Sequence, residues 1–278
     1  MSCKQHKSDI CFKVFNVYKI YIEVLSLTNL IIKEKKMNKK IILSSFASLL
    51  FLSQAANAEI KIGKGSLTFN AGASSQYIFR GVDQNKDAAS PFVGADFTHP
   101  VGDFNLYLGA WTGAQDNVTG AGGQEIDYYA GITKSFGPAT FDIGYIIMTY
   151  PGAATKDIKE VSEYYGKITI APNKQPYTFG LAYYADDTGG VKHSTLTTKT
   201  LDESYYEVNA TYNFGPAQGL VSYGIFKNDT QTTTVSLSKE IVGVGFTLSY
   251  INAEREDVTL SNLNKDREYV TLSAKKVF

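Results

Sequence analysis

Apolar and polar residues alternate along most of the chain after residue 58, with the period of two that a β-strand imposes. In the first such segment, the residues on one face are Leu67, Phe69, Ala71, Ala73, Tyr77 and Phe79, and those on the other are Thr68, Asn70, Gly72, Ser74, Gln76 and Arg80. Similar alternation returns at residues 93–97, 104–110, 126–132, 141–147, 164–170, 177–183, 206–214, 221–225, 235–237, 242–250 and 270–274. The pattern therefore predicts twelve strands.

Short and long connections alternate strictly between these segments. Tight turns rich in Gly, Pro and Asn fall at residues 100–103, 136–139, 172–176 and 214–217 and near Glu240. Long polar segments fall at residues 81–90, 113–124, 151–159, 186–203, 228–232 and 253–266. Transmembrane barrels have short periplasmic turns, longer external loops and an even number of strands. The order predicts an all-β, up-and-down antiparallel transmembrane barrel of twelve strands, with both ends of the domain on the periplasmic side.

A soluble β-sandwich would also alternate apolar and polar residues, but it normally carries Lys and Glu on its outer faces. Here the polar faces are mostly Gly, Ser, Thr, Asn and Tyr, with isolated charges. Aromatic residues gather towards the strand ends, where they could form membrane-interface girdles: Tyr77, Phe79, Phe136, Tyr150, Tyr177, Phe214 and Tyr250. These features favour the barrel over the sandwich.

Residues 37–58 have the order of a secretory signal peptide. Lys39 and Lys40 supply the positive start, residues 41–52 are an apolar run too short to span a membrane as a helix, and residues 56–58 read Ala-Asn-Ala. We expect cleavage between Ala58 and Glu59. Residues 1–36 are then not part of the functional protein, and residues 59–278 form a single barrel domain.

The composition of residues 59–278 excludes several classes of function. Both cysteines, Cys3 and Cys11, precede this region, so it offers no disulfide, cysteine metal site or cysteine nucleophile. Nine of the 27 Lys and Arg residues and three of the 27 Asp and Glu residues precede Glu59. The remaining 18 basic and 24 acidic residues leave a net charge of about −6, which does not favour nucleic-acid binding.

Residues 75–81 read Ser-Gln-Tyr-Ile-Phe-Arg-Gly. This stretch resembles the S-x-Y-x-F-R-G signature at the end of the first strand in TorF-type porins, a family of proteobacterial outer-membrane proteins. The resemblance extends over residues 59–278 and includes the repeated Phe-Gly-Pro turns and the last strand, which ends in Phe278. A carboxyl-terminal Phe after alternating apolar residues is similar to the signal read by the barrel-assembly machinery, although Lys276 replaces the usual apolar residue. The resemblance implies an outer-membrane location, contact with lipid and lipopolysaccharide, and no particular solute.

Hydrolytic chemistry has weak support in the sequence. His99 precedes a predicted periplasmic turn, and His193 lies in the longest loop, among hydroxyl residues and near Asp186 and Asp187. A catalytic triad needs its members held in register, which an irregular loop does not provide. The acidic loop residues, including the run at 254–257, could bind divalent cations at the cell surface, but solvated loops explain them as well. We predict no enzyme, no cofactor and no metal site.

The best functional candidates are charged and aromatic residues on the interior phase of the strands. The predicted pore-lining residues are Arg80, Asp96, Tyr107, Trp111, Asp127, Tyr129, Lys167 and Glu207. We expect Arg80 to point inwards from the first strand, with Tyr77 and Phe79 towards lipid, and to be paired with Asp96, or with Asp127 or Glu207. Twelve strands do not decide whether the interior is open. We predict a porin-like channel for small hydrophilic solutes or ions. A non-conducting barrel with partner-binding loops is the alternative, and a lipid-modifying enzyme is the third possibility.

Overall fold

The computed structural model describes residues 59–116, 123–151, 160–187, 204–227, 231–254 and 267–278. All of them belong to one compact unit, residues 45–278. The predicted signal peptide, the segment before it and His193 lie outside the described residues.

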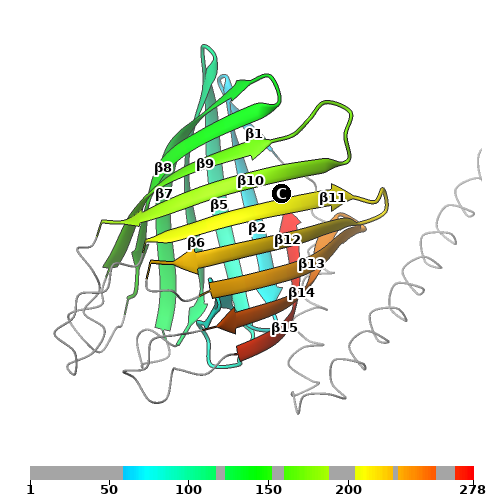
Figure 1. The fold of residues 1–278 in the computed structure, drawn as a ribbon. Helices are drawn as coiled ribbons and strands as arrows, with labels where there is room; N and C mark the ends of the chain where they lie inside the picture. The colour runs from blue at the N-terminus through cyan, green and yellow to red at the C-terminus, as the bar shows by residue number, and fades with distance from the viewer. Residues whose placement is uncertain (1–58, 117–122, 152–159, 188–203, 228–230, 255–266) are drawn as a thin grey trace, which may run out of the picture. The chain divides into compact units, whose positions relative to one another are not determined.

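Twelve long antiparallel strands form the wall of a closed barrel, and each pairs with the next in sequence (Figure 1). They are β2 (Gly65–Ser74), β5 (Ser90–Val101), β6 (Phe104–Gln115), β7 (Gly123–Phe136), β8 (Ala139–Thr149), β9 (Glu160–Ile170), β10 (Tyr177–Asp186), β11 (Tyr205–Asn213), β12 (Gln218–Phe226), β13 (Gln231–Ile241), β14 (Val244–Glu254) and β15 (Arg267–Val277). Three short strands complete the set: β1 (Ile60–Ile62), β3 (Ile78–Phe79) and β4 (Val82–Asp83). The predicted twelve-stranded up-and-down barrel is confirmed.

The barrel closes where β2 pairs with both β5 and β15. The seam with β15 runs from Ser74 opposite Ser273 to Asn70 opposite Val277. Two further backbone hydrogen bonds extend it, because the N–H groups of Phe278 and Phe69 donate to each other's carbonyl oxygens at 2.7 and 3.2 Å. Beyond this point β1 pairs with the same edge of β2, with Ile60 opposite Leu67.

The alternation read from the sequence divides the wall into an apolar outer surface and a polar interior. On β8, for example, Phe141 and Ile143 are 41% and 66% exposed, and Asp142 between them points inwards to the cavity described below. Large apolar side chains such as Leu181, Val208 and Leu237 are about half exposed on the outside. An apolar exterior around a polar interior is the pattern of barrels that span membranes.

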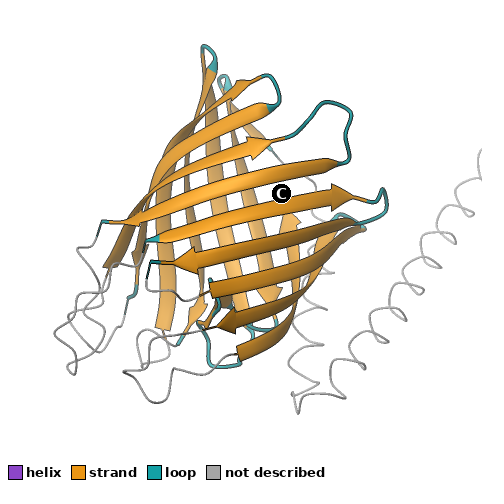
Figure 2. Cartoon of the chain, in the orientation of Figure 1, coloured by secondary structure: helices purple, strands orange, loops and turns teal. Residues whose placement is uncertain are grey.

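The connections at the two ends of the barrel differ as predicted. At one end, tight turns join β5 to β6, β7 to β8 and β13 to β14, and glycines with positive φ occur at Gly102, Gly137 and Gly243 (Figure 2). We call this the short-turn end and the opposite one the long-loop end. The described residues are strands and irregular connections without helices, and none of their segments is a helix long and apolar enough to cross a membrane.

The first long connection, residues 75–89, departs from the prediction. The first strand stops at Ser74, and the chain then forms the small β3–β4 hairpin instead of continuing to Arg80. Arg80 and Gly81 are the two central residues of this hairpin and have φ values of 47° and 79°. Positive φ at both positions is typical of a type I′ turn. We call residues 75–89 the inward loop, because its contacts lie inside the barrel.

The inward loop also corrects the expected aromatic girdle. Tyr77 and Phe79 do not face outwards, since the Tyr77 ring packs on Trp111 and the Phe79 ring contacts the Arg80 guanidinium. Tyr150 is 8% exposed and is therefore buried as well. Apolar and polar residues continue to alternate past Ser74 because the short strands of the β3–β4 hairpin have the same period of two. Phe136 and Phe214, by contrast, are 57% and 59% exposed near the short-turn end.

Candidate functional site

The inward loop is fastened across the barrel by Arg80. The Arg80 Nη1 and Nη2 atoms donate to Oε1 and Oε2 of Glu163 on β9 at 2.6 and 2.8 Å, and the two side chains are only 8% and 4% exposed. In the circular strand order, β9 and β10 lie half-way round the barrel from β2, where the loop begins. A bidentate pair of this kind is strong and fixes the orientation of both groups.

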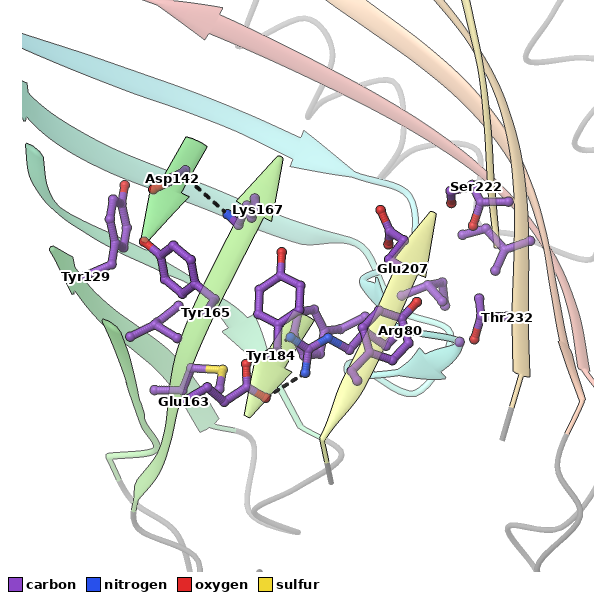
Figure 3. A pocket seen from close by; sticks show the side chains of 18 of the residues that line it. Arg80, Tyr129, Asp142, Glu163, Tyr165, Lys167, Tyr184, Glu207, Ser222 and Thr232 are labelled. Atoms are coloured by element: carbon purple, nitrogen blue, oxygen red, sulfur yellow. Dashed lines mark hydrogen bonds and ion pairs between the residues drawn. The ribbon is translucent and has the colours of Figure 1, made fainter. Parts of the chain in front are cut away.

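Aromatic rings surround the same guanidinium. The Arg80 Cζ atom lies 4.3 Å from the ring centre of Tyr184, 4.6 Å from that of Tyr205, 4.7 Å from that of Phe79 and 5.9 Å from that of Phe226. Cations are attracted to aromatic faces at these distances. Figure 3 shows the guanidinium beside the Tyr184 ring, with its dashed contact to Glu163. The inward loop therefore has an ionic anchor in an aromatic cage.

The predicted partners of Arg80, which were Asp96, Asp127 and Glu207, are wrong, because the ion pair is made with Glu163. Asp96 is held elsewhere, because it accepts hydrogen bonds from the Tyr129 hydroxyl and from Asn70 Nδ2, the latter at 3.2 Å. The sequence did contain a signal for Glu163, since it stands four residues before Lys167 on the same interior phase of β9. That signal could not select Glu163, because the path of the inward loop was not predicted.

A cavity of about 490 Å³ lies beside this anchor inside the barrel. Its lining combines two cations, three carboxylates, five tyrosines and several hydroxyl and apolar side chains (Figure 3). The charged residues are Arg80, Lys167, Asp142, Glu163 and Glu207, and the tyrosines are Tyr107, Tyr129, Tyr165, Tyr184 and Tyr205. The size is within the usual range of small-molecule sites.

The other ionic groups of the cavity are less tightly held than Arg80. Lys167 Nζ lies 3.9 Å from Asp142 Oδ2 and 4.2 Å from the ring centre of Tyr165, and the lysine side chain is 36% exposed. Asp142 also accepts a 2.6 Å hydrogen bond from the Tyr107 hydroxyl, which lies 2.6 Å from the Tyr165 hydroxyl. Glu207 accepts a 3.2 Å hydrogen bond from Asn209. Lys167 and Glu207 are thus the charges best placed to meet a solute.

Glycines on the neighbouring strands leave room for the tyrosine rings. Tyr129 is the cross-strand partner of Gly109, and Tyr107 is the partner of Gly131. Tyr165 is likewise the partner of Gly144. A Cβ atom at any of these glycines would collide with the tyrosine ring or its hydroxyl. The rings therefore lie along the wall over the glycines.

Four of the predicted pore-lining residues besides Arg80 contact the cavity, and three do not. Tyr107, Tyr129, Lys167 and Glu207 line it, whereas Asp96, Trp111 and Asp127 lie elsewhere on the interior wall. Trp111 packs on the rings of Tyr77 and Phe92, with centroid distances of 5.6 and 6.0 Å. The sequence reasoning missed Asp142, Glu163, Tyr165, Tyr184 and Tyr205, although each has the interior phase of its strand.

Asp127 and Glu125 form a buried acidic pair behind the inward loop. Their residues are 9% and 3% exposed, and Asp127 Oδ1 and Glu125 Oε2 have no hydrogen-bond partner among the described residues. Tyr77 of the inward loop lies against them, and burial raises the pKa of its phenol above the ordinary value. The Tyr77 hydroxyl can donate a hydrogen bond towards this pair.

We expect the substitution Gly81→Val to displace the inward loop. A Cβ atom at Gly81 would lie 2.6 Å from Thr232 Oγ1 and 2.8 Å from the Ala253 side chain, and the φ of +79° adds backbone strain. The loop should then become accessible to protease in the folded barrel. Gly102→Val is the matched control, because Gly102 also has a positive φ, of 58°, but no atom within 4 Å of its Cβ position. Equal protease resistance in both variants would contradict the packing described for the loop.

Catalytic and metal-binding groups are sparse in the described region. His99, its one histidine, stacks on Phe97 with a centroid distance of 6.2 Å near the short-turn end, away from the cavity residues. The described residues contain no group of three or more His, Cys, Asp or Glu side chains arranged to hold a metal ion.

Solved structures share the barrel fold at low sequence identity. The structure described as "KdgM porin" is 9% identical with a TM-score of 0.51, and the match covers 76% of this chain and 99% of that one. An active-site mutant of outer membrane phospholipase A from Escherichia coli is 10% identical with a TM-score of 0.51, covering 81% and 95%. These likenesses show the fold alone, since one protein is a porin and the other an enzyme.

No curated protein matches the chain in sequence. The family model described as "Bacterial protein of unknown function (Gcw_chp)" matches residues 61–274. The match covers more than three quarters of the sequence, and the chain therefore belongs to the Gcw_chp family.

Proposed function

We propose that the protein is an outer-membrane channel of a Gram-negative bacterium that passes small hydrophilic solutes or ions by diffusion. The observation that carries the proposal is the cavity of about 490 Å³, lined by charged and hydroxyl groups, inside a barrel with an apolar outer surface. In porins the polar interior of such a barrel is a water-filled channel, and charges in a narrow passage select among ions.

The inward loop gives the channel its narrowest part. It enters from the long-loop end and is fastened to the far wall by Arg80 and Glu163, so a solute must pass between the loop and the remaining wall. The cavity lining holds three carboxylates and two cations. We therefore expect a mild preference for cations over anions.

The location rests on several features of the sequence. The signal peptide at residues 37–58 would direct the chain across the inner membrane, and the motif at residues 75–81 supports a TorF-type porin. Phe278, whose backbone bonds to Phe69 at the closing seam, would serve the barrel-assembly machinery. Outer-membrane lipid and lipopolysaccharide would surround the apolar surface. We propose no enzymatic activity.

Single-channel recording on protein purified from outer membranes tests the proposal. Added to a planar lipid bilayer, the protein should produce stepwise increases in current with a modest cation preference. A sample that migrates differently on a gel before and after boiling is folded, and it provides the control. Folded protein that inserts without conductance steps would contradict the channel and favour the alternative, a closed barrel whose long loops bind a partner.

A further inference from the structure

The cavity has a continuous row of aromatic rings on three adjacent strands. Tyr165, Tyr184 and Tyr205 are cross-strand partners on β9, β10 and β11. The ring centroids are 5.8 Å apart between Tyr165 and Tyr184 and 6.2 Å apart between Tyr184 and Tyr205. Arg80 covers one face of Tyr184 and one face of Tyr205, and Lys167 covers one face of Tyr165, so a solute can meet only the parts of the row that these cations leave uncovered.

Hydroxyl groups continue the wall on the next two strands. Ser222 on β12 and Thr232 and Thr234 on β13 line the same cavity. Thr232 is 4% exposed, and its Oγ1 atom has no hydrogen-bond partner among the described residues. Gly81 of the inward loop covers this atom, so Ser222 and Thr234 are the hydroxyl groups left to meet a polar solute.

The charges of the cavity do not favour an acidic solute. The Arg80 cation is neutralised by its bidentate contact with Glu163 and is only 8% exposed. Lys167 lies close to Asp142, and Glu207 adds a further negative charge on β11, two strands from Lys167. An acidic solute would therefore meet more carboxylates than available cations.

We propose that the cavity is a recognition site for an uncharged polyhydroxylated ring, such as a monosaccharide, on its way through the channel. The apolar face of a pyranose ring would lie on the part of the tyrosine row that borders the cavity and that Arg80 and Lys167 leave uncovered, and its hydroxyls would bond to the threonine, serine and carboxylate oxygens. This proposal rests on the proposed channel function and specifies the solute class for it.

Block of the ion current by three probes of similar size tests the recognition. Glucose is an uncharged ring, glucuronate is its acidic counterpart, and mannitol is an open-chain polyol without a rigid apolar face. Added to the conducting protein, glucose should reduce the current at lower concentration than the other two. Equal block by glucose and mannitol, or stronger block by glucuronate, would overturn the solute class. Absence of any conductance would instead overturn the channel itself.

Substitution at Tyr165 links the block to the aromatic row. Tyr165→Leu removes one ring, so we expect the glucose concentration for half-block to rise about threefold to tenfold. Tyr165→Phe keeps the ring and should retain most of the block. The matched control is Tyr164→Leu, because Tyr164 is the next residue on β9 and is 57% exposed on the outer surface. An unchanged half-block in conducting Tyr165→Leu protein, or an equal change in Tyr164→Leu, would refute the site.

Discussion

Arg80→Ala is expected to open the channel and to increase its preference for cations. Breaking a buried ion pair by removing one partner typically costs about 3–5 kcal/mol, because the remaining charge is left without compensation. Here the abandoned group would be Glu163, which is 4% exposed. The barrel can relieve that cost by releasing the inward loop and hydrating the carboxylate. Single-channel conductance should therefore rise, and the uncovered carboxylates should attract cations.

Two further variants make this result specific to the anchor. Lys86→Ala removes another ion pair of the same loop, to Asp116, but that pair is largely exposed, at 54% and 31%, so conductance should barely change. The double variant Arg80→Ala/Glu163→Gln removes both charges and should conduct well with a weaker cation preference than Arg80→Ala alone. Wild-type conductance and selectivity in Arg80→Ala would contradict the role assigned to the inward loop.

Val208→Arg should destabilise the barrel strongly in a lipid bilayer. Val208 lies in the middle of β11 and is 50% exposed on the outer surface. An arginine facing lipid near the midplane of a membrane costs about 2–4 kcal/mol in barrels of this kind. The midpoint of denaturant-induced unfolding from lipid vesicles should fall accordingly, and the loss should shrink in small detergent micelles.

The adjacent residue provides the control for the direction of the side chain. Asn209 points inwards and donates a hydrogen bond to Glu207, so Asn209→Arg places the same cation beside a carboxylate. This variant should unfold near the wild-type midpoint but conduct less current, because the longer side chain narrows the passage. Equal destabilisation by the two arginines would mean that the outer surface of β11 does not face lipid.

The wall of the barrel was predictable from the sequence because apolar outer residues and polar inner residues alternate along each strand. The period of two fixed the phase of every long strand, including that of Lys167 and Glu207, and the lengths of the connections fixed the topology. Interior groups such as Asp142 and Tyr165 follow the same phase and could have been found by applying it fully.

The inward loop could not be predicted in the same way. Its position depends on contacts with strands half-way round the barrel, such as Arg80 with Glu163 and Gly81 beside Thr232. The pair is separated by 83 residues in sequence, and no local pattern connects them. The local clue was Arg80-Gly81 as a type I′ turn, but arginine rarely adopts positive φ without tertiary support. The alternation therefore predicted a first strand that continues to Arg80, whereas the strand ends at Ser74 and the hairpin follows.

Because of the closing seam, we expect the barrel to tolerate a different order of its strands in the sequence. Along the edge of β2, β15 reaches Phe278 opposite Phe69, and β1 begins at Ile60 opposite Leu67. Both strands run antiparallel to β2, so they are collinear, and Glu59 occupies the one register step between them. A peptide bond from Phe278 to Glu59 would make one continuous strand with little or no added linker. A circular permutant of residues 59–278, with new ends in a connection at the long-loop end, would then retain every strand pairing of the wall.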